Sequence, residues 1–259
     1  MMRNVGSSSS SGKGIAAVVG VGPQLGRSVA RKFAHEGYTV AILARDLGRL
    51  SRVAEEIARE EKAQVFAIRI DCADPRSVRE AFEGVLSLGF VEVLVYNAYH
   101  SSSSYPSHHP TSFTHIPFQS FQTSISVSVF AAFLCAQQVI PGMMDKGKGT
   151  ILFSGCSASL NGVAGFSELC CGKFALRALS QCLAREYQAF GIHVAHVIID
   201  GVVGPPSIHF LNLEIYGERR KREELLLVPH TAKRKKHRTE RNGRRAIIQY
   251  WRSRWRRRR

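Results

Sequence analysis

The sequence predicts a doubly wound α/β fold with a parallel sheet, on the strength of two observations. Apolar runs of five to seven residues alternate with amphipathic stretches as far as about residue 199, and a glycine-rich turn joins the first run to the first amphipathic stretch. Near-continuous apolar strands are typical of a parallel sheet that helices cover on both faces. Right-handed crossovers then place a ligand crevice at the carboxyl ends of the strands.

The elements follow one another as strand and helix. Six apolar runs are expected to form the strands Ile15–Val19, Thr39–Leu43, Gln64–Ile70, Val91–Tyr96, Thr150–Ser154 and His193–Ile198. Five amphipathic stretches are expected to form the helices Leu25–His35, Leu47–Glu61, Arg76–Leu88, Phe118–Met144 and Phe166–Phe190. Strands that alternate with helices of this length indicate βαβ units rather than hairpins.

The glycine turn is the first sign of a ligand. Its residues run Gly20-Val-Gly22-Pro-Gln24-Leu25-Gly26-Arg27 between the first expected strand and the first expected helix. A helix that starts at such a turn directs free backbone N–H groups and its positive dipole end at a phosphate. Glycine lets the backbone approach that phosphate without a Cβ in the way. The turn therefore predicts a dinucleotide site, against the alternative that the glycines serve packing alone.

Charge and composition divide the chain into three segments: a flexible Ser-rich leader over 1–13, one α/β domain over 14–206 and a basic tail over 207–259. The chain carries a net charge of +16. Residues 1–206 hold 18 Lys and Arg against 15 acids, whereas the last 53 residues hold 18 against 5. We expect the tail to be mostly disordered, because charge runs without apolar periodicity bury too little surface to offset their ordering entropy.

Two further functional expectations depend on residues of the basic tail alone. Lys233–Arg238 resembles a nuclear localisation signal, and arginines beside Trp251 and Trp255 could hold nucleic acid. The alternative is a plain basic extension that stems from an aberrant gene model. Outside the tail, the sequence predicts a cytoplasmic protein. We expect no insertion in a membrane, because no uninterrupted apolar segment approaches the roughly 20 residues of a bilayer span.

The six cysteines lie in apolar or helical stretches and lack the spacing of metal ligands. They are expected to be buried thiols of a reducing compartment, with no metal site. Adjacent Cys170 and Cys171 are expected to point to different faces of a helix.

Residues 14–203 resemble the short-chain dehydrogenase/reductase family, whose members have a Rossmann fold. The family pattern T-G-x-x-x-G-x-G is similar to the stretch from Val19 to Gly26, although Val19 replaces Thr and Gln24 replaces the middle glycine. Gln24 puts a bulky side chain where the family backbone approaches phosphate.

Three further positions carry the resemblance to the cofactor site. Asp71 matches the family aspartate near the adenine ring, and Cys72 would then lie beside the adenine edge. Asn97-Ala98-Tyr99 resembles the N-A-G element after the fourth strand, with Tyr99 in place of Gly. In the family that element supports the sheet close to the nicotinamide ribose.

The choice of cofactor depends on the end of the second strand. An acid there pairs with a ribose 2′-OH and repels a 2′-phosphate, but this chain has Arg45. Arg27 follows the glycine turn, and two guanidinium groups close together favour a phosphate. We therefore expect NADP rather than NAD. Asp46, the acid next in sequence, is interpreted as a helix cap.

The catalytic positions depart further from the family. Its chemistry uses Asn, Ser, Tyr and Lys, with Tyr and Lys four residues apart. Lys173 matches the lysine, which holds the nicotinamide ribose, but Leu169 stands at the tyrosine position. Family spacing places Cys156, beside Ser157, at the serine position and Ser128 at the asparagine position. Leucine cannot donate a proton, and such transfer is worth roughly 10²–10⁴ in rate.

Two hypotheses follow from these positions. The first is an NADP-linked oxidoreductase that transfers hydride between the cofactor and a small carbonyl or alcohol, with Lys173, Cys156, Ser157 and Ser128 as candidate catalytic residues. The second is a relative that binds a dinucleotide but has lost turnover and acts as a sensor or scaffold. Beyond Pro206 nothing resembles the family's substrate lid or last strand, so the substrate and the oligomeric state stay open.

Overall fold

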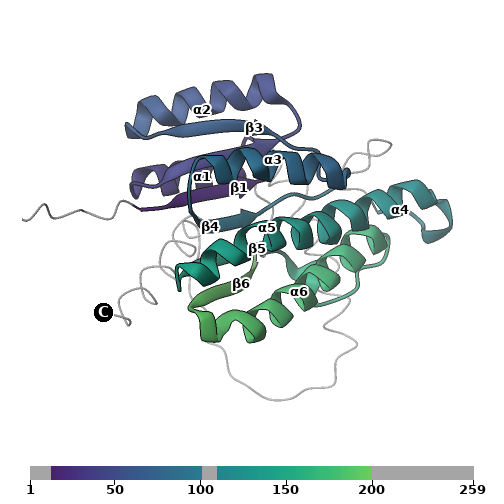
Figure 1. The fold of residues 1–259 in the computed structure, drawn as a ribbon. Coiled ribbons are helices and arrows are strands. Elements are labelled where there is room, and N and C mark those ends of the chain that lie inside the picture. Colours follow the sequence, from purple (N-terminus) through teal and green to yellow (C-terminus); the bar gives the residue numbers. More distant parts are fainter. Residues whose placement is uncertain (1–12, 101–109, 200–259) are drawn as a thin grey trace, which may run out of the picture. The chain divides into compact units, whose positions relative to one another are not determined.

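The computed structural model describes residues 13–100 and 110–199 and contains one parallel sheet (Figure 1). Its strand order is β3-β2-β1-β4-β5-β6. The strands are β1 (Ile15–Val19), β2 (Thr39–Ala44), β3 (Val65–Arg69), β4 (Val91–Tyr96), β5 (Gly149–Gly155) and β6 (Ile192–Ile198). This order confirms the predicted doubly wound fold, and every expected strand is present with shifts of one residue at most at either end.

The helices also match the expected positions, with one exception. They are α1 (Leu25–His35), α2 (Leu47–Glu61), α3 (Pro75–Ser87), α4 (Phe118–Ile125), α5 (Ala131–Asp145) and α6 (Ser167–Tyr187). The single helix expected over Phe118–Met144 is wrong in one respect. A π-helical turn, Ser126–Phe130, lies between α4 and α5.

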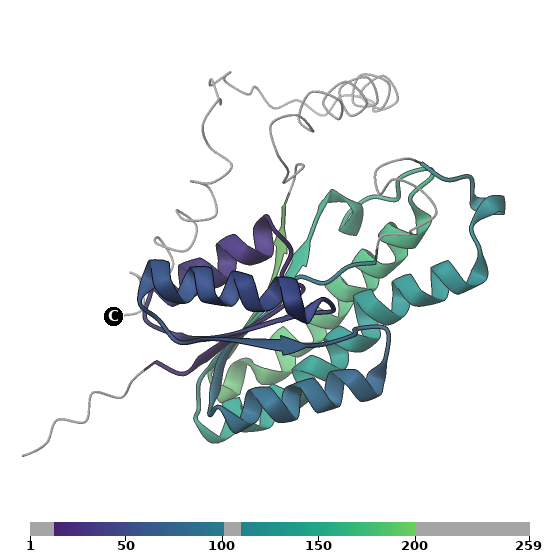
Figure 2. The ribbon, with the colours of Figure 1, turned by 90° about the horizontal axis from the view of Figure 1, so that it is seen from above.

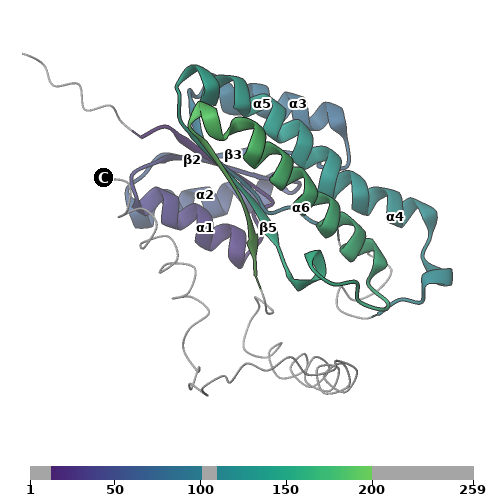
Figure 3. The same ribbon diagram turned by 90° about the horizontal axis from the view of Figure 1, so that it is seen from below.

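Helices cover both faces of the sheet (Figures 2 and 3). One face packs on α1 and α2, where Ala30, Leu50 and Ile57 meet Ile42 and Val95 of the strands. The other face packs on α3, α5 and α6, where the core includes Phe82, Val139 and Leu176. Burial on both sides explains why the strands are almost wholly apolar.

Tyr96, at the end of β4, stabilises the π-helical turn. A π-turn displaces the backbone hydrogen bonds of the surrounding helix by one residue and leaves carbonyl groups in need of other donors. The Tyr96 side chain is fully buried, and its hydroxyl donates to the Val127 carbonyl within that turn. Burial raises the pKa of the Tyr96 phenol well above its usual range, so the hydroxyl keeps its proton and acts as a donor.

One helical stretch, Phe118–Asp145, is long and apolar enough to cross a membrane by length and composition, with a mean hydropathy of 1.6. The sequence expectation missed it because polar residues such as Gln137 and Gln138 interrupt the apolar run, whereas the mean hydropathy of the stretch stays high. Half of its apolar window is buried in the fold. Cys135, Ala136, Val139 and Met143 belong to the core beneath the sheet, which is the arrangement of a core helix.

Several sequence expectations lie outside the described residues. They are the leader over 1–12, most of the polar loop over 101–109, and the basic tail with Lys233–Arg238, Trp251 and Trp255. The domain boundary at 206 lies there too.

Replacing Tyr96 with Phe is expected to lower the free energy of unfolding by about 1–3 kcal/mol, because the buried Val127 carbonyl loses its donor. Chemical denaturation followed by circular dichroism measures the change. Tyr38→Phe is the matched control, because the half-buried Tyr38 ring packs edge-on against Phe33 and keeps that contact. It should change stability by no more than about 0.5 kcal/mol. Equal losses in both variants would contradict the role assigned to Tyr96.

Candidate cofactor and active site

The carboxyl ends of β1 and β4 meet at the centre of the sheet. β1 pairs with β2 on one side and with β4 on the other, so the connections leave it in opposite directions from this point. In open α/β sheets a ligand crevice lies at such a switch point. Gly20 follows β1 here and Asn97 follows β4.

The glycine turn is locked onto the end of β4. Gly20 has φ of +87°, and a Cβ at this position would lie 2.4 Å from the backbone nitrogen of Ala98. The Asn97 amide group donates to the Gly20 carbonyl at 3.0 Å, and the Asn97 backbone N–H donates to Val19 O at 2.8 Å. The structure thus brings Gly20, Asn97 and Ala98 together as expected.

Gly26 serves helix packing, whereas Gly22 leaves space. A Cβ on Gly26 would lie 2.7 Å from Val21 Cα, so α1 could not approach the turn with any larger residue. A Cβ on Gly22 would meet no atom within 4 Å. The alternative interpretation of the turn, in which the glycines serve packing alone, therefore explains Gly26 but not Gly22.

The start of α1 forms a cradle that fits a pyrophosphate. Gln24 is the N-cap residue, its side chain is exposed, and it makes no capping hydrogen bond. The amides of Leu25 and Gly26 lie in the first helical turn, where backbone N–H groups have no intrahelical acceptor. Together with the open space at Gly22, these donors and the helix dipole suit an anionic group. The Gln24 side chain does not fill that space.

Arg27 does not join Arg45 in the way the sequence suggested. Its guanidinium group donates to Glu56 at 3.0 Å and to Glu60 at 3.3 Å, both on α2. The reason is tertiary: α1 and α2 lie side by side on one face of the sheet, and the acidic surface of α2 attracts the arginine. The expectation that the guanidinium groups of Arg27 and Arg45 lie together at one phosphate is therefore wrong for Arg27.

Arg45 stands at the crevice without a carboxylate partner among the described residues. It is exposed at the end of β2 and its charge acts on Cys72 and His100, which follow β3 and β4. Burial lowers the pKa of His100, the Glu168 carboxylate opposes this effect, and the Arg45 charge adds to it. The neighbouring Asp46 accepts a hydrogen bond from Arg49 N at 3.0 Å, which confirms its expected role as the cap of α2.

Asp71 and Cys72 follow β3 at the same edge. The Asp71 carboxylate accepts from Ala73 N at 2.9 Å, while its own backbone N–H donates to Ser77 Oγ. These bonds fix the turn and leave the second carboxylate oxygen without a partner in the described structure. Burial raises the pKa of the Cys72 thiol to about 11, against the opposing charge of Arg45.

Lys173 is buried at the carboxyl end of β5, with 7% of its surface exposed. Its ammonium group donates to the Ser154 carbonyl at 2.8 Å. Burial lowers the pKa of Lys173, and the nearby Cys156 acts in the opposite direction. Leu169 lies one helical turn earlier on α6 and is partly exposed.

The structure brings Cys156 to Lys173 and packs Ser128 against Gly172, the residue directly before Lys173. Cys156 directly follows β5, and Ser157 begins the short 3₁₀ turn after it. Ser128 is 2% exposed inside the π-helical turn, and its Oγ lies 2.7 Å from the point that a Gly172 Cβ would occupy. Ser128 therefore fills the contact between this turn and α6, because Gly172 leaves room for it.

His196 is a site residue that the sequence reasoning missed. Its ring lies against Gly155, where an added Cβ would be 2.0 Å from Cε1. Both ring nitrogens are buried and have no hydrogen-bond partner in the described structure. Burial, followed by the charges of Lys173 and Arg177, lowers the pKa of His196 to about 4. Strand alternation could have found it, because His196 shares a face of β6 with buried Val194.

The cysteines complete the comparison with the sequence expectations. Cys171 and Cys182 are exposed, so the expectation that all six thiols are buried is wrong, whereas the expected opposite orientation of Cys170 and Cys171 is confirmed. His115 is exposed. Within residues 13–100 and 110–199 no three His, Cys, Asp or Glu side chains are close enough to share a metal ion.

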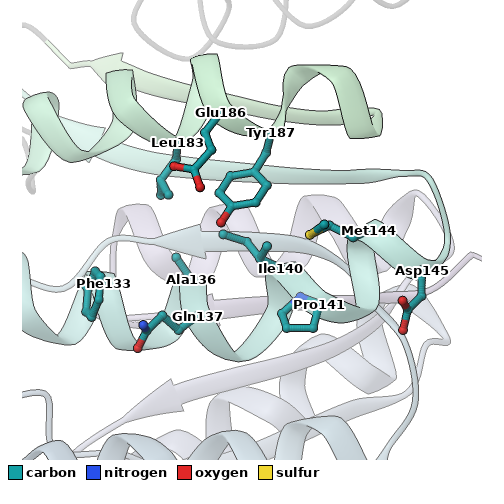
Figure 4. Close-up of a pocket in the computed structure, with 10 residues that line it drawn as sticks. All are labelled: Phe133, Ala136, Gln137, Ile140, Pro141, Met144, Asp145, Leu183, Glu186 and Tyr187. Carbon is teal, nitrogen blue, oxygen red and sulfur yellow. The ribbon is translucent and has the colours of Figure 1, made fainter.

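A groove of about 550 Å³ lies between α5 and α6, away from this edge (Figure 4). Ile140, Met144, Leu183 and Tyr187 line it near the C-terminal ends of both helices. Those ends precede β5 and β6, so the groove lies toward the amino edge of the sheet. It is separate from the crevice.

A locked glycine turn at the switch point of a parallel sheet is the arrangement of the doubly wound, dinucleotide-binding class of α/β proteins. The chain belongs to the short-chain dehydrogenase family, whose model matches residues 14–207. It is 27% identical over 199 residues to the human very-long-chain 3-oxoacyl-CoA reductase, which covers 75% of this chain and 62% of that protein. It therefore spans less than two thirds of that reductase.

Two further proteins are similar to this chain. The human inactive hydroxysteroid dehydrogenase-like protein 1 is 29% identical over 186 residues, which is 71% of this chain and 54% of that protein. The L-sorbose reductase of Gluconobacter frateurii, solved with NADPH and L-sorbose, superimposes with a TM-score of 0.69 at 24% identity. The match covers 79% of this chain and 75% of the reductase, and it shows a shared fold.

Thiol alkylation should separate the cysteines by position. Exposed Cys171 and Cys182 are expected to react with iodoacetamide at pH 8 within minutes. Buried Cys72 and Cys135 should react with iodoacetamide most slowly. For Cys72, a pKa of about 11 leaves roughly one thiol in a thousand ionised at that pH. Peptide mass spectrometry over a time course reads each site. Unfolding in guanidinium is the control and should equalise the six rates, whereas fast labelling of Cys72 in the native protein would contradict its burial.

Proposed function

We propose that the protein is an NADP-dependent oxidoreductase that transfers hydride between NADP(H) and a small carbonyl or alcohol. The observation that carries this proposal is the locked turn at the switch point, with open space at Gly22 beside an uncapped helix start. Family membership supplies the reaction class. When bound, the nicotinamide cofactor supplies or accepts the hydride.

The chain's own residues bind and orient. Leu25 and Gly26 amides would hold the pyrophosphate, and Asp71 with Cys72 would border the adenine. Asn97 and Ala98 would support the ribose side of the crevice, where Lys173 lies buried at the end of β5. Cys156 and Ser157 stand beside Lys173, in a position to contact a substrate oxygen.

The preference for NADP over NAD rests on Arg45 alone. It is exposed at the end of β2 and makes no ion pair among the described residues, so its guanidinium group is free to pair with a 2′-phosphate. Asp46, the acid that could have repelled that phosphate, is engaged as the cap of α2. Arg27 is held by Glu56 and Glu60 and contributes no pairing.

Replacing Arg45 with Ala is expected to weaken NADPH binding about tenfold or more and to leave NADH binding nearly unchanged, because a charge-assisted hydrogen bond is worth about 1.5–3 kcal/mol. Fluorescence titration of the full chain with each cofactor measures both constants. Arg27→Ala is the matched control and should not alter the ratio of the two affinities, because that arginine faces α2. An unchanged NADPH constant in Arg45→Ala would contradict the preference.

A second function is favoured by one residue. Leu169 occupies the position four before Lys173 and offers no proton, so the chain would bind the cofactor without turnover and act as a sensor or scaffold. A human relative carries the word inactive in its name. The two functions share a cofactor site and differ in whether the cofactor is consumed.

Consumption of NADPH distinguishes them. Acetoacetyl-CoA and L-sorbose, chosen from the names of the relatives, serve as carbonyl probes, with loss of absorbance at 340 nm as the readout. The first function predicts turnover with a probe, and the second predicts binding without consumption.

Restoring the phenol should increase any turnover. Leu169→Tyr is expected to raise the rate by roughly 10²-fold or more if the rest of the site is intact, because it returns a proton donor beside Lys173. Leu169→Phe is the matched control: it adds the ring without the hydroxyl and should not raise the rate. The same steady-state assay measures both variants. An equal gain in the two would attribute the effect to packing rather than to proton transfer.

A further inference from the structure

Two titratable side chains converge on one peptide at the end of β5. The Lys173 ammonium group donates to the Ser154 carbonyl at 2.8 Å, and the His196 ring lies against the adjacent Gly155. They come from different elements, α6 and β6, and α6 packs against β6 on one face of the sheet. Cys156 follows Gly155 directly and is close enough for its charge to affect Lys173.

The titratable groups that act on the two side chains at this peptide include a thiol and a guanidinium group but no carboxylate. The groups that act on Lys173 and His196 from the packed elements are Cys156 after β5 and Arg177 on α6. In the described part of the chain neither Lys173 nor His196 has a carboxylate partner. The buried ammonium is therefore not neutralised by an acid, which is unusual for a lysine with 7% exposure.

The Lys173 ammonium group also has unused donors. An ammonium carries three N–H bonds, and one of them goes to Ser154 O. Leu169, one turn earlier on the same helix, offers no acceptor to the other two. Two N–H bonds of Lys173 would therefore be available to a substrate oxygen that reached this end of β5, where position 169 supplies no phenol.

We propose that Lys173 is itself the proton donor to the substrate oxygen, in place of the side chain that Leu169 lacks. This inference rests on the proposed oxidoreductase function. In the reducing direction the carbonyl carbon receives the hydride of NADPH, the C=O electron pair moves to oxygen, and one Lys173 N–H bond breaks as an O–H bond forms. The products are the alcohol, NADP⁺ and a neutral Lys173 amine, which regains its proton from water.

The surroundings suit this role. Burial lowers the pKa of Lys173 and makes its ammonium a better acid at neutral pH than a surface lysine. His196, with a pKa of about 4, is uncharged at neutral pH and so exerts neither attraction nor repulsion through a net charge on the Lys173 ammonium group. A carboxylate at position 196 would instead attract that group and raise the pKa of Lys173.

The first test measures the proton on Lys173 without any catalysis. NMR of the ¹³Cε–¹⁵Nζ group in the full-length, lysine-labelled protein follows its titration, with Lys173→Met to assign the signal. The proposal expects a midpoint below that of the surface lysines. His196→Asp should move the midpoint upward, and the matched control His196→Asn should leave it unmoved above pH 5, because it exchanges one neutral side chain for another. A Lys173 midpoint equal to that of surface lysines would overturn the proposal.

The second test asks whether the reaction uses that proton. Single-turnover oxidation of NADPH by acetoacetyl-CoA or L-sorbose, at saturating cofactor, is expected to slow as pH rises through the Lys173 midpoint. Lys173→Met should slow it at least about 100-fold. In His196→Asp the pH at which the rate falls should increase together with the NMR midpoint of Lys173. If His196→Asp does not fold, the wild-type limb and wild-type midpoint must still coincide.

The outcomes separate this inference from the proposed function. Failure to bind NADPH in the titration would reject the function itself. The protein could also bind NADPH and transfer hydride at a rate that does not fall at the pH of the Lys173 midpoint. That result would reject Lys173 as the donor and leave the proposed function standing. Binding without transfer to either probe would overturn the inference and support the second function.

Discussion

The site depends on the contact between Gly20 and the Asn97–Ala98 peptide. The turn after β1 lies so close to the end of β4 that no Cβ fits between them, and the Asn97 amide group closes the contact with a hydrogen bond. This contact sets where α1 starts, and hence where its free N–H groups point. A larger residue at Gly20 would displace the turn and the helix start together.

The same packing that builds the crevice limits which charges reach it. α1 and α2 share one face of the sheet, and the acidic residues of α2 hold Arg27 away from the end of β2. Arg45 is left as the basic group at that point. In the proposed function, cofactor preference would thus depend on a competition between a phosphate and a neighbouring helix for the available guanidinium groups.

At the end of β5 the chain combines an apolar substitution with an unneutralised buried lysine. Leu169 removes a proton donor, while Lys173, Cys156 and His196 gather around the Ser154–Gly155 peptide. Gly155 permits this, because any Cβ would collide with the His196 ring. Burial without an acid favours the neutral amine, and so keeps Lys173 ready to release a proton.

The residue pattern was sufficient to predict the sheet, the helices α1, α2, α3 and α6 and the glycine turn, because apolar periodicity and turn glycines are local signals. It also predicted Asp46 as a helix cap, for the same reason. It could not predict the π-helical turn, since the bond from the Tyr96 hydroxyl to Val127 joins residues 31 positions apart. The cysteine exposures were missed because α6 has an outer face that composition alone does not reveal.

The sequence by itself determined the fold class, the place of the glycine turn and the absence of a phenol at position 169. Each of these depends on residue type and on spacing along one strand or helix. Only the tertiary structure decided that Arg27 faces α2, that Ser128 packs on Gly172 and that His196 joins Lys173. Those outcomes depend on which helices lie side by side and on the space that each glycine leaves, and such distances between elements are set by packing.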